Sequence, residues 1–76
     1  MLVELMVRES CGSCKRVKEQ IEPVVRDAGA KLLVVDVDEQ GLAAEYGDRV
    51  PVVVINGEEF ACWEVDNDEL RAELGG

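Results

Sequence analysis

Histidine is absent from this 76-residue chain, and cysteine occurs only three times. Structural zinc sites need four ligands, which cysteine and histidine normally provide. Cys11, Cys14 and Cys62 are too few, so we expect no metal site within one molecule. An odd number of cysteines is also atypical of secreted domains, whose cysteines are normally paired in disulfides.

Long apolar runs are also missing from the sequence. No stretch approaches the roughly 20 apolar residues that are needed to cross a bilayer. The N-terminal run Met1–Val7 is too short for the apolar region of a signal peptide, and it contains Glu4. We therefore expect a cytoplasmic protein that is not bound to membranes, in a compartment that keeps cysteines reduced.

Basic residues are scarce: eight Lys and Arg stand against 17 Asp and Glu, which gives a formal net charge of −9. This balance disfavours nucleic acid and anionic membranes as partners. Half of the cations lie within residues 8–18, namely Arg8, Lys15, Arg16 and Lys18. They form either the solvated face of a helix or a local positive field that favours thiolates and attracts anionic thiols.

The pattern of apolar and turn-forming residues predicts a single α/β domain over residues 1–76. Short apolar runs indicate buried strands, and apolar residues at spacings of three and four indicate the first helix. The expected elements are strands at 2–7, 32–35, 52–55 and 58–63, a helix that opens at Cys11 and stops at Gly29, a short helix at 39–46 and a last helix from Asp66. Strands that are apolar on both sides predict helices on both faces of the sheet.

Several local signals sharpen this β-α-β-α-β-β-α order. Pro23 lies inside the first helix and should kink it. Asn56-Gly57 is a strong signal for a hairpin with a type I′ turn. Asp66-Asn67-Asp68-Glu69 reads as a capping box at the start of the last helix. Gly75-Gly76 is expected to be a flexible tail, and the first strand-helix-strand unit should be a right-handed crossover.

The spacing Cys11-x-x-Cys14 at a junction between a strand and a helix is the strongest chemical signal in the chain. A thiolate at Cys11 can accept hydrogen bonds from free backbone N–H groups, and the helix dipole, Lys15 and Arg8 also act to lower the pKa of Cys11. Cys14 is placed to attack a mixed disulfide formed at Cys11. The pair therefore predicts thiol–disulfide exchange, with Cys11 as nucleophile and Cys14 as resolving thiol.

Arg49-Val50-Pro51 precedes the third predicted strand, and the local sequence alone favours a trans Val50–Pro51 bond. Taken together, three segments resemble the thioredoxin superfamily, and most closely its short bacterial glutaredoxin-like proteins. These segments are Cys11-Gly12-Ser13-Cys14, Val50-Pro51 before the run Val52–Ile55, and the hairpin Asn56-Gly57-Glu58.

The resemblance implies a thioredoxin fold with a mixed four-stranded sheet in the order second-first-third-fourth. In this sheet the third strand is antiparallel to the first two strands and to the fourth. It also implies that Pro51 is cis and lies beside the cysteines, and that the Val50 backbone pairs with a substrate. The activity implied is dithiol reduction of protein or low-molecular-weight disulfides.

The sequence departs from the relatives that use glutathione or thioredoxin reductase. Gly12 and Ser13 replace the aromatic residue common in glutaredoxin motifs, Ser10 replaces the tryptophan of thioredoxins, and Ala61–Asp66 lacks the Gly-Gly pair that holds glutathione. The sequence therefore does not distinguish glutathione from a thioredoxin reductase as the electron donor. We expect no resident cofactor. We expect a monomer whose partners are disulfide substrates and a reductase.

Lys15 and Arg49 are candidates to contact an anionic substrate, or else ordinary exposed cations. Cys62 reads as a small core residue or as a regulatory thiol. Trp63 reads as a packing residue that is partly exposed at the end of the sheet. Two functions of other classes compete with the oxidoreductase. One is a soft-metal-binding module, which has the order β-α-β-β-α-β, and the other is a redox-inert adaptor, which would not need the cysteine pair.

Overall fold

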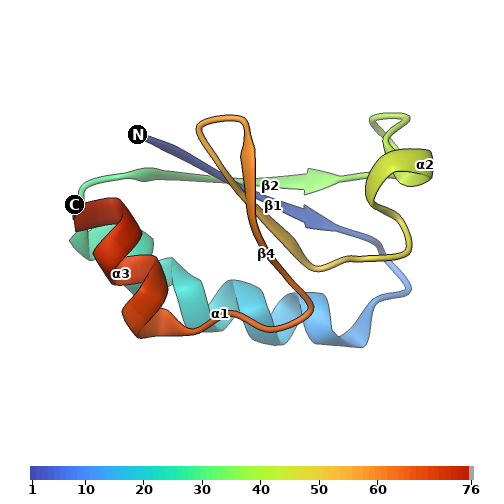
Figure 1. The fold of residues 1–76 in the computed structure, drawn as a ribbon. Helices are drawn as coiled ribbons and strands as arrows, with labels where there is room; N and C mark the ends of the chain where they lie inside the picture. The colour runs from blue at the N-terminus through green and yellow to red at the C-terminus, as the bar shows by residue number, and fades with distance from the viewer. Residues whose placement is uncertain (76) are drawn as a thin grey trace.

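The computed structural model describes residues 1–75 and shows one sheet with helices packed against it (Figure 1). Strands and helices follow the predicted order. They are β1 (Leu2–Val7), α1 (Gly12–Asp27), β2 (Lys31–Asp36), α2 (Ala43–Tyr46), β3 (Val52–Ile55), β4 (Glu58–Cys62) and α3 (Asn67–Gly75). None of these helices is long and apolar enough to cross a membrane.

The four strands form one mixed sheet in the order β2-β1-β3-β4. β1 is parallel to β2, and β3 is antiparallel to both β1 and β4. This confirms the topology that the resemblance implied. All four residues of β3 are buried, because this strand lies inside the sheet and its side chains alternate between two apolar clusters.

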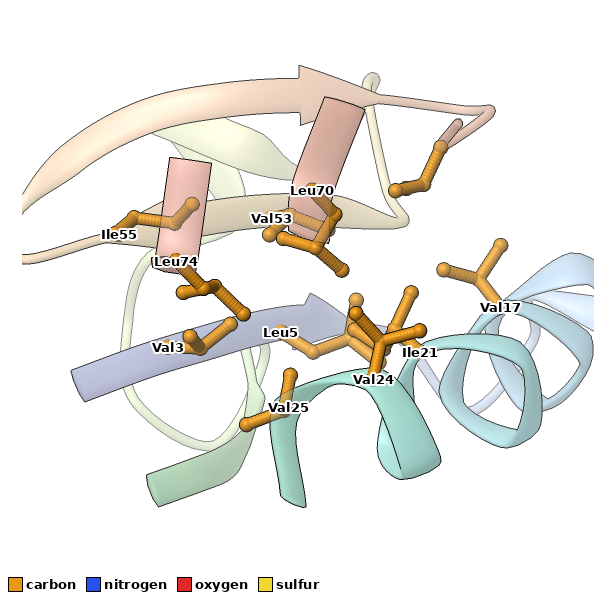
Figure 2. Packing of buried hydrophobic residues seen from close by; sticks show 11 residues of the cluster. Val3, Leu5, Val17, Ile21, Val24, Val25, Val53, Ile55, Leu70 and Leu74 are labelled. Atoms are coloured by element: carbon orange, nitrogen blue, oxygen red, sulfur yellow. The ribbon is translucent and has the colours of Figure 1, made fainter. Parts of the chain in front are cut away.

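The larger apolar cluster, here the inner cluster, lies between the sheet and the two longer helices (Figure 2). Its buried members are Val3, Leu5, Val17, Ile21, Val24, Val25, Val53, Ile55, Val65, Leu70 and Leu74. The α1 residues in this set follow the spacings predicted from the sequence. The cluster fixes α1 against β1, and this contact determines where the first turn of α1 lies.

Helix α1 ends as predicted at Gly29. Gly29 has a positive φ of 73°, its N–H donates to Arg26 O, and the Ala30 N–H donates to Val25 O. These two bonds form a Schellman motif, which satisfies carbonyls at the end of the helix. Pro23 lies within α1, which continues to Asp27; the kink expected at Pro23 stays a prediction.

The last helix is anchored to the first at its start. The Asp66 carboxylate accepts hydrogen bonds from the N–H groups of Asp68 and Glu69, which confirms Asp66 as the N-cap. The Gln20 side-chain amide on α1 donates to Val65 O and to Asn67 Oδ1. Gly75 belongs to α3 rather than to a tail, and Gly76 lies outside the described residues.

Helices lie on both faces of the sheet, as expected, but the second face is covered at one end only, and the expectation that β2 is buried was wrong. Here α2 packs on a smaller apolar group, the outer cluster, which consists of Met6, Val37, Val52 and Val54. The exposed fractions of Leu33 and Val34 on β2 are 45% and 41%. β2 is an edge strand and α2 has only four residues, so neither side of β2 is fully covered.

Three element boundaries also differ from the prediction. α2 begins at Ala43 rather than at residue 39, because Asp36 Oδ1 accepts from the N–H groups of Asp38 and Glu39 and holds a turn there. β2 extends one residue further at each end. β4 ends at Cys62 rather than at Trp63, whose φ of 68° is outside the strand region. The Asn56–Gly57 turn has positive φ at both residues, which confirms type I′.

Candidate active site

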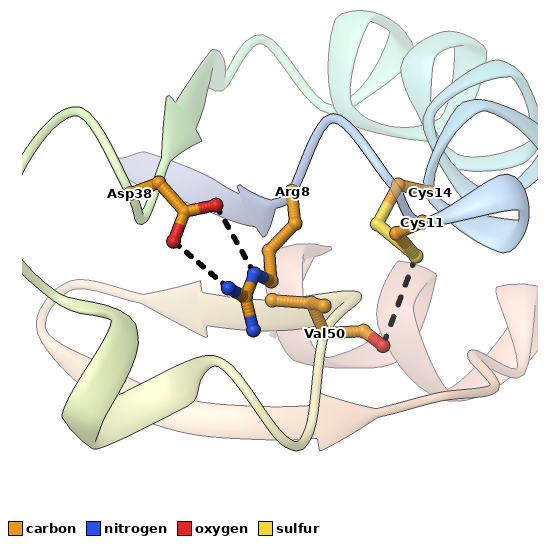
Figure 3. The surroundings of a disulfide bond; sticks show 5 residues. All are labelled: Arg8, Cys11, Cys14, Asp38 and Val50. Carbon is orange, nitrogen blue, oxygen red and sulfur yellow. Dashed lines mark hydrogen bonds and ion pairs between the residues drawn. A yellow bond between two sulfur atoms is a disulfide. The ribbon is translucent and has the colours of Figure 1, made fainter.

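Cys11 and Cys14 form a disulfide at the beginning of α1 (Figure 3). Their Cα atoms are 5.5 Å apart. Cys11 is the N-cap residue, with an extended backbone, and its N–H donates to Arg8 O in the turn that leads out of β1. The inner cluster holds α1 against β1, so the fold fixes the position of the pair at the end of the first strand.

The two cysteines differ in accessibility. Cys11 is half-buried and Cys14 is only 4% exposed, on the side of α1 that faces the sheet. An incoming substrate therefore has access to Cys11 first. Cys14 is held within disulfide distance behind it. This arrangement suits attack by Cys11 followed by resolution by Cys14.

The Val50–Pro51 step lies directly beside this pair. The bond is cis, so the preference for trans drawn from the local sequence was wrong and the family resemblance was right. The Val50 carbonyl oxygen is 3.9 Å from Cys11 Sγ (Figure 3). Pro51 is buried, and its carbonyl accepts from the Trp63 N–H. Among residues 1–75 the Val50 N–H has no backbone acceptor.

Arg8 forms an ion pair with a carboxylate, so its positive charge acts less strongly on the cysteines. Its Nε donates to Asp38 Oδ2 at 3.1 Å and its Nη2 to Asp38 Oδ1 at 3.0 Å (Figure 3). Asp38 comes from the turn after β2, thirty residues away in sequence. The pair partly neutralises the positive charge that we expected at Cys11, and the sequence contained no local signal for it.

Arg49 is likewise engaged within the protein. Its guanidinium donates to Glu59 Oε1 and to Glu45 O, and lies 5.6 Å from the centre of the Tyr46 ring. The hydrogen bond to Glu59 raises the pKa of Arg49 above its ordinary value. These contacts favour a structural role that joins α2 to β4. By contrast, Lys15 is exposed and forms no ion pair within residues 1–75.

Cys62 is a free, half-buried thiol that packs against the outer cluster, as a small core residue would. Trp63 is 59% exposed, in agreement with the partial exposure expected for it. Within residues 1–75 no three side chains of His, Cys, Asp or Glu converge as metal ligands would. The chemistry that the geometry offers is therefore that of a reversible dithiol with one accessible sulfur.

Residues 2–75 match the glutaredoxin-like domain family (DUF836). The uncharacterized protein Rv0508 of Mycobacterium tuberculosis is 42% identical over 78 residues, which cover 95% of this chain and 80% of that protein. The uncharacterized protein Mb0520 of Mycobacterium bovis matches to the same extent.

Two solved structures share the fold. The structural genomics target XcR50 of X. campestris has 31% sequence identity and a TM-score of 0.70, over 95% of this chain and 93% of that one. Thioredoxin 1 of Thermosipho africanus has 21% identity and a TM-score of 0.65, over 97% of each chain. The chain therefore has the thioredoxin fold and belongs to the glutaredoxin-like domain family.

Proposed function

We propose that this protein is a dithiol oxidoreductase that reduces protein or low-molecular-weight disulfides. The observation that carries the proposal is the Cys11–Cys14 disulfide at the start of α1, with Cys11 accessible, Cys14 buried and the Val50 carbonyl beside the Cys11 sulfur. The family and the fold support a redox function of this kind.

The reaction proceeds by two exchanges of sulfur partners. The Cys11 thiolate attacks one sulfur of the substrate disulfide, forms a mixed disulfide and releases the other sulfur as a thiolate, which takes a proton. The Cys14 thiolate then attacks Cys11 Sγ and releases the second substrate thiol. The substrate gains two electrons and two protons, and the protein becomes the Cys11–Cys14 disulfide seen here. The unpaired N–H groups at the beginning of α1 stabilise the Cys11 thiolate between cycles.

The substrate lies against the Val50–Pro51 segment in this proposal. The Val50 backbone forms strand-like hydrogen bonds with the chain next to the substrate cysteine, since its N–H has no backbone acceptor within residues 1–75. Buried Pro51 keeps the segment in place. Lys15 meets negative charge on the substrate. Arg49, which we also considered for that role, is occupied by Glu59 and Glu45.

A reductase system must return two electrons to the oxidised pair. We propose a cytoplasmic monomer that takes them from glutathione or from a thioredoxin reductase. Oxidised protein is supplied with NADPH and either glutathione plus glutathione reductase or thioredoxin reductase alone. The mixture in which the protein causes NADPH consumption identifies the donor.

Turnover of 2-hydroxyethyl disulfide, a small uncharged substrate, tests the activity itself. Dithiothreitol as donor keeps this assay independent of the natural reductase. Cys11→Ser abolishes turnover above the uncatalysed rate, whereas Cys62→Ser, a control at the third cysteine, retains it. Equal rates for the wild type and Cys11→Ser would refute the proposed function.

A further inference from the structure

The positive charges of this acidic chain fall into two groups. One group is paired with carboxylates and consists of Arg8, Arg26, Arg49 and Arg71. The other group forms no ion pair within residues 1–75 and consists of Lys15, Arg16, Lys18 and Lys31. All of the second group except Lys31 lie in the first two turns of α1, directly after Cys11. The cations that form no ion pair are thus concentrated beside the disulfide, on a segment that also carries the exposed carboxylates of Glu9, Glu19 and Glu22.

Two of these cations lie on the same side of the helix as the accessible sulfur. Lys15 and Lys18 follow Cys11 by four and seven residues, which are about one and two helical turns, whereas Arg16 faces another direction. Both lysines are exposed. The first turns of α1 lie at the end of the helix away from α3, so α3 does not cover them (Figure 1). Their ammonium groups are free to meet a partner that approaches Cys11.

An open groove continues from Lys18 along the same side of α1. It has a volume of about 430 Å³ and runs between α1 and the exposed edge of the sheet. Leu32 and Val34 of β2 form its apolar wall, and Lys18 and Arg26 lie on its helical wall with Glu22 between them. A polypeptide bound at Cys11 can therefore extend past two lysines and place apolar side chains against β2.

We propose that the substrate is a protein disulfide flanked by an acidic and apolar segment, which Lys15, Lys18 and this groove recognise. The proposal rests on the oxidoreductase function proposed above and assigns its substrate class. The net charge of −9 alone would favour basic partners. Salt screens that overall charge beyond about 8–10 Å, so the nearby lysines dominate for a segment in contact with them.

A single-turnover experiment tests the preference. Reduced protein is mixed with one of two peptides of equal length, each with one internal disulfide, whose flanks carry either Asp and Leu or Lys and Leu. Acid quenching and mass spectrometry give the second-order rate constant for each peptide. The acidic peptide reacts faster by roughly fivefold, the factor expected from two exposed ion pairs, and the advantage declines as salt is added.

Matched variants locate the preference. The ratio of the two rate constants on one variant cancels any change in the reactivity of Cys11. Lys15→Gln combined with Lys18→Gln brings the ratio down to one or below, and Lys31→Gln, an unpaired lysine at the start of β2, keeps the wild-type ratio. Lys18→Gln alone slows the acidic peptide more than glutathione disulfide, because Lys18 lies about 10 Å along the helix from Cys11 and acts on an extended chain.

Three results would overturn the assignment: no preference for the acidic peptide, a preference that survives the double variant, or equal slowing of glutathione disulfide by Lys18→Gln. The last result would mean recognition of any small anionic disulfide. Reduction of 2-hydroxyethyl disulfide separates these outcomes from failure of the proposed function, since Cys11-dependent turnover of this uncharged substrate shows the oxidoreductase activity without recognition by the lysines.

Discussion

Two leucine substitutions test the layered packing that positions α1 and the cysteine pair. Leu70 on α3 is fully buried in the inner cluster, whereas Leu33 on the edge strand β2 is 45% exposed. The sequence alone predicted a buried strand over residues 32–35, which include Leu33. Substitution by alanine removes the same atoms at each position, so the difference in stability measures the difference in surroundings.

The structure sets the expected magnitudes. Leu70→Ala lowers the free energy of unfolding by about 3 kcal/mol. The removed atoms no longer contribute their burial from water, and the cavity that they leave destabilises the fold further. Leu33→Ala lowers it by about 1 kcal/mol or less, because its side chain is half in water already. With a slope of about 1 kcal/mol per M urea for a small domain, the midpoints fall by about 3 M and by about 1 M or less.

Urea unfolding followed by circular dichroism at 222 nm measures both changes. A domain of this size has a total stability of about 4–11 kcal/mol, so Leu70→Ala must be tested at low temperature with a stabilising salt if it is partly unfolded. Equal losses for the two variants would show that β2 is covered and that the outer face is not open. A loss below about 1 kcal/mol for Leu70→Ala would show that α3 does not complete the core.

Three further predictions follow from single residues. Gly47→Ala lowers the free energy of unfolding by about 1–3 kcal/mol, because the new Cβ meets the Ala43 carbonyl and the Arg8 side chain. Gly12→Ala is neutral or stabilising, because Gly12 has a negative φ and open space around its Cβ position. Thermal melts of the two variants measure the difference. Asp66→Ala lowers the free energy of unfolding by about 1 kcal/mol through loss of the α3 N-cap, whereas Asp66→Asn keeps most of this capping stability, as urea unfolding will show. In the reduced protein Cys11 reacts with iodoacetamide at neutral pH faster than a free cysteine and faster than Cys62, as peptide mapping after short exposure will measure. A rate of alkylation at Cys11 no higher than that of the free thiol would contradict its activation.

The sequence was sufficient for those features of the fold that depend on local patterns. The α1 apolar stripe, its end at Gly29 and the Asn56–Gly57 turn each arise from residues close together in the chain. The exposure of Leu33 and Val34 could not be foreseen, because an apolar run looks the same in an edge strand and in a central one. Position in the sheet, not local pattern, decides their burial.

The candidate site divides in the same way. The spacing of Cys11 and Cys14 and their place after β1 were readable from the chain. The cis Val50–Pro51 bond was not, because local preference favours trans and only the family resemblance implied otherwise.

The partners of the arginines were also beyond the sequence. Asp38 and Glu59 reach Arg8 and Arg49 through the tertiary fold. These pairs leave Lys15 and Lys18 as cations without an ion pair on the side of α1 that carries Cys11. The structure was needed to distinguish them from Arg8 and Arg49.

The central claim is that Cys11 is the attacking thiol and Cys14 the resolving thiol, and trapping of the mixed disulfide tests it most directly. Reduced Cys14→Ser protein is mixed with a disulfide peptide, and the adduct is located by mass spectrometry of a digest made without reductant. The account predicts a stable peptide adduct on Cys11. Under the same conditions Cys11→Ser should form no comparable adduct, since Cys14 is buried. Adduct formation on Cys14 in preference to Cys11, or on Cys62 alone, would contradict the account.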